Sequence, residues 1–350
     1  MTGRMEVRIG RTALKNPVIC GSGEHVMTEA GLRSAMASGV GMVIAKSFNE
    51  SEAAKDQLDR TDYSLLDGDL NRLPWDFDPP RDATLASRSG LIRTPFAEWL
   101  ETIVRLDREA AKDDVIVAPS IIMADLDASV DMARQVEQAG ARMLEFNIGT
   151  PYGDEATGVV STERATDRIT QVVRAVCDAV GIPVWAKLTG QSENVAALAD
   201  AARAGGADAA VLMGRFLGLI PDLDTQAPLL GTNLGIGGRW SLPMTCYWLA
   251  KSRKLIGPDY PLVGVNGIRG GDDAARLMLA GAHAVQLSTV VFTNGFDVLT
   301  ETVDRLAAYL DRHGDDAADI VGRAADRVKP FTDLPRQPGF WETFAPPGAA

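Results

Sequence analysis

Cationic and polar residues follow most of the short apolar runs in this chain, and together they could bind an anionic ligand. Lys46 and Lys187 stand out, because a lysine that closes a buried strand needs a polar partner. Hydroxyl and amide groups occupy the equivalent places after other runs. The residues concerned are Ser22, Gly23, Lys46, Ser47, Asn147, Thr150, Lys187, Gly214, Arg215, Asn266, Gly267, Ser288 and Thr289.

Metal and thiol chemistry are not indicated. The three cysteines, Cys20, Cys177 and Cys246, are widely spaced and include no CxxC pair. Neither a disulfide framework nor a zinc site is therefore expected. The three histidines are equally scattered, so we predict no metal.

The charge and the hydropathy exclude several classes of partner. A net charge of −12 argues against nucleic acid and anionic membranes, since both attract basic surfaces. No apolar run approaches the ~18 residues that suggest a membrane span. The first residues also lack the long apolar segment of a secretory signal. We therefore predict a soluble, cytoplasmic protein that acts on a small molecule.

The elements that must position these groups repeat along the chain. Four segments share a helical stretch, a glycine turn and an apolar run: 36–47, 138–147, 203–214 and 279–289. The glycine suits the left-handed residue that ends a helix, and the apolar run suits a buried parallel strand. Four further apolar runs make eight predicted strands: Val18–Cys20, Val115–Ile122, Pro183–Leu188 and Pro261–Val265.

Amphipathic helix patterns separate these runs. Their apolar faces include Leu126, Val130, Ala133 and Val136 in one helix, and Val172, Val173, Val176 and Val180 in another. Eight alternations of strand and helix predict one α/β domain over residues 1–350, a TIM (β/α)8 barrel with long βα loops at its C-terminal face. A doubly wound open sheet is the alternative.

Three stretches fall outside the repeat. Residues 51–96 are polar and rich in Pro, Asp and Arg, and residues 214–243 are rich in Gly and Pro. Loops this long are usually functional lids or disordered. Both leave from C-terminal strand ends, so we predict lids. The tail 329–350 is irregular and is predicted to wrap the surface or a partner subunit.

The last two predicted strands carry a phosphate signal. Barrels commonly bind phosphate with the loops after strands 7 and 8 and the start of a short helix. Here those loops read GVNGIRGGDDAARL and QLSTVVF. Glycine lets backbone N–H groups approach phosphate oxygens, and Ser288 and Thr289 add hydroxyl donors. A phosphorylated cofactor or substrate is therefore favoured over a pair of ordinary tight turns.

These features resemble a known family. Over residues 8–312 the chain is similar to the class 1 dihydroorotate dehydrogenases and the related dihydropyrimidine dehydrogenase barrel. The resemblance rests on eight blocks in order: NPVICGSGEHVMT (16–28), IAKS (44–47), GLIRTPFAEWL (90–100), EFNIGTP (145–151), VWAKL (184–188), GIGGRWSLP (235–243), GVNGI (264–268) and AVQLST (284–289).

The resemblance implies FMN as the cofactor and assigns its contacts. Lys187 is expected near the pyrimidine end of the isoalloxazine, where its charge stabilises the reduced ring. Asn147 is expected to contact both flavin and substrate. The residues expected to hold FMN are Ser22, Gly23, Lys46, Ser47, Asn147, Lys187, Gly237, Gly238, Asn266, Gly267, Ser288 and Thr289. Relatives often dimerise, which makes a homodimer the expected state, with an unidentified electron acceptor.

The chain departs from the family at the substrate. The family's catalytic cysteine or serine is Thr150 here, so Thr150 is the expected proton-transfer group, beside Lys46 and Asn147. A threonine hydroxyl needs activation for this role. Three of the family's four substrate-binding asparagines are replaced, at Ser87, Tyr152 and Gly214, the last followed by Arg215.

Each lost amide weakens binding by about 1–1.5 kcal/mol. We therefore predict an FMN-dependent oxidoreductase that transfers a hydride between flavin N5 and a CH–CH or C=C unit of a small cyclic or carbonyl substrate other than orotate. Ser87, Tyr152 and Arg215 are its expected substrate ligands. The alternatives are a genuine dihydroorotate dehydrogenase, a non-redox barrel that binds a phosphorylated ligand, and a flavin-dependent lyase.

Overall fold

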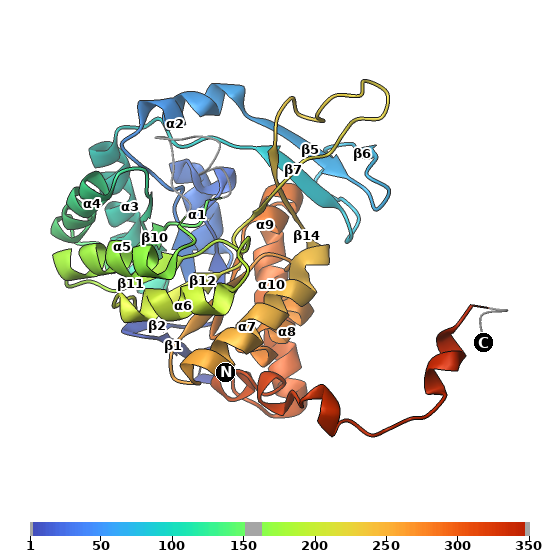
Figure 1. Ribbon diagram of the computed structural model, residues 1–350. Coiled ribbons are helices and arrows are strands. Elements are labelled where there is room, and N and C mark those ends of the chain that lie inside the picture. Colours follow the sequence, from blue (N-terminus) through green and yellow to red (C-terminus); the bar gives the residue numbers. More distant parts are fainter. Residues whose placement is uncertain (1–2, 151–162, 347–350) are drawn as a thin grey trace.

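The computed structural model describes residues 3–150 and 163–346, and its centre is a ring of parallel strands (Figure 1). Each strand is short, and its side chains are almost all buried, as expected for a sheet covered on both faces. In ring order the strands are β8 (Ile116–Ala118), β4 (Met42–Ile44), β3 (Val18–Cys20), β16 (Ala284–Leu287), β15 (Leu262–Val265), β12 (Ala209–Leu212), β11 (Val184–Lys187), β10 (Leu144–Asn147) and β9 (Ser120–Ile122).

The ring closes through one interrupted strand. β8 pairs with β4 and β9 pairs with β10, and only Pro119 separates β8 from β9. Proline cannot donate a ladder hydrogen bond, which accounts for the break. The nine strands of this sheet in the described chain thus fill eight positions. The predicted (β/α)8 barrel is confirmed, and the alternative open sheet is excluded.

Helices surround the ring (Figure 1). They are α1 (Glu29–Ala37), α3 (Phe96–Ala110), α4 (Leu126–Gln138), α5 (Thr166–Ala179), α6 (Val195–Ala204), α7 (Leu242–Ile256), α8 (Gly271–Leu279), α9 (Thr289–Asn294) and α10 (Asp297–His313). Several helix starts are capped: Thr28 accepts a hydrogen bond from Gly31 N, and Asp125 accepts one from Ala128 N.

The four predicted helix-ending glycines adopt the expected conformation. Gly39, Gly140, Gly206 and Gly281 have φ of +82°, +91°, +97° and +121°. Each allows the chain to leave a helix and enter the next barrel strand, a backbone geometry that other residues rarely adopt. The repeated sequence signature therefore corresponds to one repeated structural unit.

The two long excursions meet in a second sheet. The antiparallel order is β13 (Phe216–Gly218), β14 (Leu234–Gly238), β7 (Thr84–Arg88), β5 (Asp62–Leu66) and β6 (Arg72–Leu73), with the short α2 (Glu52–Asp56) before it. The sequence pattern predicts loops here, because these strands are short and contain glycine or polar residues, which carry little strand signal. β1 (Val7–Ile9) and β2 (Thr12–Leu14) form a hairpin at the opposite end of the barrel (Figure 1).

The C-terminal tail leaves the barrel after η7 (Ala325–Arg327) and extends away from it (Figure 1). Its described part contains only the short turns η8 (Phe331–Asp333) and η9 (Phe340–Phe344). It does not wrap around its own barrel. None of the helices in the described ranges combines the length and the apolar character that a bilayer span needs.

Candidate functional site

A large cavity opens at the carboxyl ends of the barrel strands. Its volume is about 1380 Å³, including its open mouth. Active sites of this fold lie at this end, where the βα loops converge. Most of the predicted site residues line it: Ser22, Gly23, Lys46, Ser47, Asn147, Thr150, Lys187, Gly214, Arg215, Gly238, Asn266, Gly267, Ser288 and Thr289. The barrel thus assembles groups from all along the chain.

Lys187 stands over a fully buried carboxylate. Its Nζ lies 3.4 Å from Glu145 Oε1 and donates to Gln286 Oε1 at 3.0 Å. Gln286 in turn donates to Glu145 Oε2 at 2.6 Å, and Ser120 donates to Glu145 Oε1 at 3.2 Å. A buried charge is tolerated when it is paired and hydrogen-bonded in this way. The network holds the ammonium of Lys187 at one position at the cavity floor.

Lys46 has a carboxylate partner of its own. Its Nζ lies 3.2 Å from Glu24 Oε1, and both side chains are nearly buried. Burial lowers the pKa of Lys46, and Glu24 opposes that shift. Burial also disfavours ionised Glu24, but the charges of Lys46 and Arg215 outweigh it and lower the pKa of Glu24 from 4.5 to about 2. Glu24 is therefore a carboxylate at neutral pH.

This shift predicts how stability depends on pH. A carboxyl whose pKa falls from 4.5 to about 2 on folding contributes stability above pH 4.5 and loses it between pH 4.5 and 2. Glu24→Gln should lower the melting temperature at neutral pH, because Lys46 then stays buried without a counter-ion. Such a loss lowers the free energy of unfolding by about 3–5 kcal/mol. It should also reduce the loss of stability on acidification. Thermal melts from neutral pH to pH 3 test this. If the melting temperature of the variant fell with pH as steeply as that of the wild type, the prediction would be contradicted.

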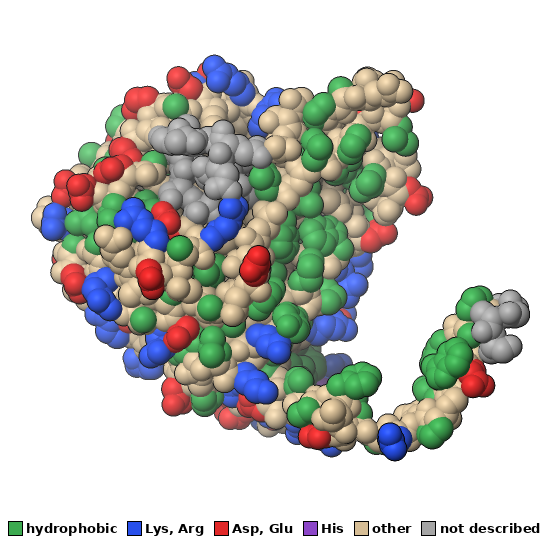
Figure 2. Space-filling view, in the orientation of Figure 1, with side chains coloured by type: hydrophobic (Ala, Val, Ile, Leu, Met, Phe, Trp, Pro, Cys, Tyr) green, Lys and Arg blue, Asp and Glu red, His purple; other side chains and the backbone are tan. Residues whose placement is uncertain are grey.

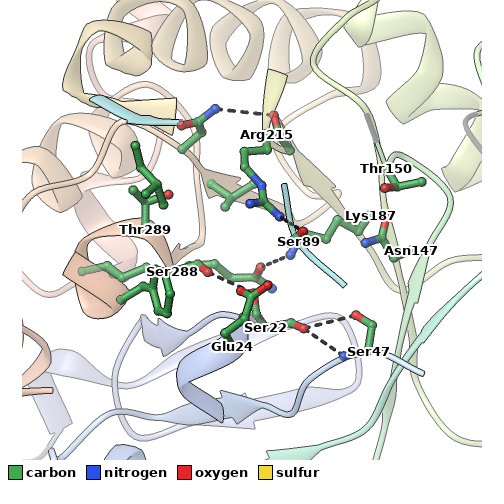
Figure 3. A pocket seen from close by; sticks show the side chains of 18 of the residues that line it. Ser22, Glu24, Ser47, Ser89, Asn147, Thr150, Lys187, Arg215, Ser288 and Thr289 are labelled. Carbon is green, nitrogen blue, oxygen red and sulfur yellow. Dashed lines mark hydrogen bonds between the residues drawn. The ribbon is translucent and has the colours of Figure 1, made fainter. Parts of the chain in front are cut away.

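A row of serine hydroxyls joins the two lysine clusters. Ser120 Oγ lies 2.8 Å from Ser47 Oγ, which lies 3.1 Å from Ser22 Oγ. The backbone N–H of Ser47 donates to Ser22 Oγ as well. Ser22 and Ser47 line the cavity (Figure 3), and Ser120 donates to Glu145. The row fixes the ends of three neighbouring strands to one another.

The predicted phosphate corner lies on the other side of the cavity. Asn266 and Gly267 have φ of +77° and +88°. A Cβ at Gly267 would lie 2.4 Å from Leu242 N, so only glycine fits. Figure 3 shows Ser288 and Thr289 opposite Asn147 and Thr150. Ser288 Oγ donates to the carbonyl of Ser22 at 2.9 Å, which also ties β16 to the first barrel loop.

Two predicted residues lie behind the cavity wall. Ser87 is fully buried on β7 and accepts a hydrogen bond from Arg215 Nη1 at 2.6 Å. Gly237 backs onto the side chains of Thr289 and Asn266, which would lie 3.3 and 3.4 Å from an added Cβ. Neither residue lines the cavity. Tyr152 lies outside the described residues.

Arg215 enters the cavity from the loop that joins β12 to β13. Besides Ser87, its guanidinium donates to Ser89 Oγ at 3.2 Å, and Ser89 lines the cavity. Asn147 Oδ1 accepts from Gly149 N at 3.1 Å, and Thr150 is nine-tenths buried beside it. Figure 3 shows the guanidinium of Arg215 between the Ser288 side and the Asn147 side of the cavity.

Sequence reasoning missed the acidic and amide partners of the lysines. Glu145 stands two residues before Asn147, and Gln286 stands two before Ser288. Residues two apart on a strand share a face, so the same strands carried this signal. Glu24 directly follows Ser22 and Gly23, and only its charge marked it. All three lie within or beside segments that were already singled out.

The arrangement suits an elongated ligand with a phosphate at one end. The glycine and hydroxyl corner offers backbone and side-chain donors to a phosphate, while Lys46, Lys187 and Arg215 offer positive charge to a polar ring. A substrate that carries a carboxylate would also be attracted to the cationic side. The cavity therefore suits a phosphorylated ligand together with a small anionic substrate.

Comparison with known proteins gives similarity to dihydroorotate dehydrogenases. Residues 4–310 match the family model for dihydroorotate dehydrogenase. The catalytic subunit of dihydroorotate dehydrogenase B (NAD(+)) from Methanocaldococcus jannaschii is 28% identical over 315 residues, 89% of this chain and 94% of that protein. The Methanosarcina acetivorans subunit is 29% identical over 321 residues, 90% and 94% of the two chains. Dihydroorotate dehydrogenase A (fumarate) from Lactiplantibacillus plantarum is 28% identical over 315 residues, 89% and 95%.

Proposed function

Because this chain belongs to the dihydroorotate dehydrogenase family, we propose that it oxidises dihydroorotate to orotate with FMN as its cofactor. The family assigns it as a flavin-dependent oxidoreductase acting on a CH–CH donor. The bound flavin would accept a hydride at N5 from one ring carbon of the substrate. A proton leaves the neighbouring carbon, so that a C=C bond remains. The residues of this chain must orient the ring and receive that proton.

The predicted substrate other than orotate is wrong. Relatives aligned over 89–91% of the chain are named as dihydroorotate dehydrogenases. The prediction counted each replaced amide as a lost donor. It assigned Arg215 to a substrate other than orotate, although this guanidinium carries five N–H donors and is held by Ser87 and Ser89. A guanidinium can replace several amides toward a substrate carboxylate.

The observation that carries the proposal is the division of one cavity into two chemically different sides. The donors of Asn266, Gly267, Ser288 and Thr289 suit a ribityl phosphate, and Lys46 and Lys187 line the same cavity with charges that suit a polar ring. Gly23 lines the cavity, and an added Cβ there would lie 2.5 Å from the ring of His25, so the close packing favours glycine at this position. We assign the proton-transfer position to Thr150.

The proposal is tested by mixing the flavin-loaded protein with dihydroorotate without oxygen. We expect the visible flavin absorbance to bleach and orotate to form in equal amount. Dihydrouracil, which lacks the carboxylate, is the matched control and should bleach the flavin much more slowly. Dithionite shows that the flavin is reducible. A flavin that dithionite reduces but dihydroorotate leaves oxidised would refute the proposed reaction.

Arg215→Ala should weaken the binding of orotate while the flavin stays bound. A hydrogen bond to a charged group contributes about 1.5–3 kcal/mol, so the dissociation constant for orotate should rise by about 10–100-fold. Titration of the flavin spectrum with orotate measures this. Arg72→Ala is the control, since Arg72 is an exposed arginine of the antiparallel sheet and does not line the cavity. Equal orotate affinity in both variants would contradict the assignment.

Family membership argues against the non-redox barrel and the flavin-dependent lyase, because the family consists of oxidoreductases. The residue assignments for FMN rest on the geometry and the resemblance together. The homodimer and the cytoplasmic location stay predictions.

A further inference from the structure

The C-terminal tail exposes an unusual amount of apolar surface. Every residue from 326 to 344 is exposed. Phe331, Trp341 and Phe344 are 90%, 64% and 73% exposed, and Leu334 and Phe340 are about half exposed. Figure 2 shows these hydrophobic side chains along the projecting segment. We call residues 329–346 the arm. Side chains of this kind are normally buried, so the arm needs a surface to cover them.

The segment that precedes the arm is fixed to the barrel by an ion pair and backbone hydrogen bonds. Arg253 of α7 pairs with Asp326 at 2.8 Å, and Gly322 N and Ala324 N donate to the carbonyls of Met278 and Leu279. Beyond this clamp, the backbone hydrogen bonds of the described arm lie within the arm itself.

Prolines stiffen the arm. Pro330 is extended at φ −54° and ψ 145°, and Pro335 and Pro338 follow within a few residues. Proline-rich segments act as semi-rigid spacers. The arm therefore points away from its own barrel and is poorly suited to fold back on it (Figure 1).

A complementary surface runs along α7. Trp240, Met244, Tyr247 and Leu255 are 41%, 39%, 53% and 56% exposed. They recur at spacings of three, four and eight residues, which places them on one side of a helix. Trp240 lies in η5 (Arg239–Ser241), directly before α7, and packs on Phe216. We call these four residues the α7 stripe.

The arm and the α7 stripe carry complementary charges, and the apolar area of the arm is large enough for a stable contact. Lys251 and Lys254 are exposed beside the stripe, and each apolar cluster of the arm contains one carboxylate, Asp333 or Glu342. Four half-exposed to fully exposed aromatic rings give one arm on the order of 500 Å² of apolar surface. Two arms on two stripes would bury about 2,000 Å², the size of a stable interface.

We propose that the arm of one copy docks on the α7 stripe of a second copy, and that the exchange is reciprocal. A two-fold arrangement of this kind satisfies both arms and both stripes and closes on itself. The inference is independent of the proposed reaction. It identifies the surfaces that would form the expected homodimer.

Sedimentation of full-length variants across a wide concentration series tests the proposal. The arm variant is Phe331→Asp with Trp341→Asp, and the stripe variant is Met244→Asp with Tyr247→Asp. The control, Phe77→Asp with Leu223→Asp, changes equally exposed apolar residues elsewhere. We expect a wild-type dimer. The arm and stripe variants should each raise its dissociation constant by about 30-fold or more, and the control should leave it unchanged.

A mixing experiment separates docking between copies from docking within one copy. The stripe variant keeps an intact arm, and the arm variant keeps an intact stripe. An equimolar mixture should therefore form a heterodimer through one arm, more weakly than the wild type but more strongly than either variant alone. A monomeric wild type, a dimer insensitive to either variant, or a mixture no tighter than its components would overturn the proposal.

Discussion

Lys187→Ala is expected to slow the reduction of the flavin by dihydroorotate by about 10²–10³-fold, the usual cost of losing one preorganised electrostatic group. Lys187 is held at the cavity floor by Glu145 and Gln286, so its charge is fixed before any reaction. A fixed cation beside the ring favours the negative charge that the ring gains on reduction. Anaerobic stopped-flow absorbance with dihydroorotate measures the rate.

The same substitution should also destabilise the fold, and a second variant separates the two effects. Glu145 is fully buried, so removing Lys187 leaves a buried carboxylate without a cation. This should lower the free energy of unfolding by about 3–5 kcal/mol. Lys187→Ala combined with Glu145→Gln removes that charge and should recover the melting temperature. The double variant should still reduce its flavin slowly. Recovery of the rate together with the stability would show that Lys187 has only a structural role.

Thr150→Val should slow the same step by about 10²–10³-fold, within the range of general acid–base catalysis. Valine keeps the shape of threonine and removes the hydroxyl at the position assigned to proton transfer. Thr150 is nine-tenths buried at the cavity wall, so the change should leave the orotate affinity within a few-fold of the wild type. Flavin reduction and orotate titration, measured on the same preparation, distinguish the two effects.

The chemistry of the group at position 150 provides the sharper test. Thr150→Cys should give a rate that rises with pH as the thiolate forms, because a thiol has an ordinary pKa near 8.5 and a threonine hydroxyl does not ionise in this range. Thr189→Val is the matched control, since Thr189 is a buried threonine of the next loop that bonds Gln191 N. A Thr150→Val enzyme with wild-type rates would remove Thr150 from the mechanism.

The sequence by itself determined the barrel. Buried parallel strands read as apolar runs, and a glycine at each helix end marks where the chain reverses, because both signals are local. Gly39, Gly140, Gly206 and Gly281 all have positive φ. The strand ends also identified Lys46, Lys187 and most of the cavity lining, since the carboxyl ends of barrel strands share one face.

Only the tertiary structure decided which groups neutralise one another. Glu145, Gln286 and Lys187 come from three strands, and Glu24 and Lys46 follow two further strands, β3 and β4. Ser87 was expected at the substrate, yet it lies behind Arg215, because β7 and β14 pair across about 150 residues of chain. Partners so far apart leave no periodic trace in the sequence. The sequence shows which side chains carry charge, but which charges pair with each other is decided only when the strands of the barrel come together.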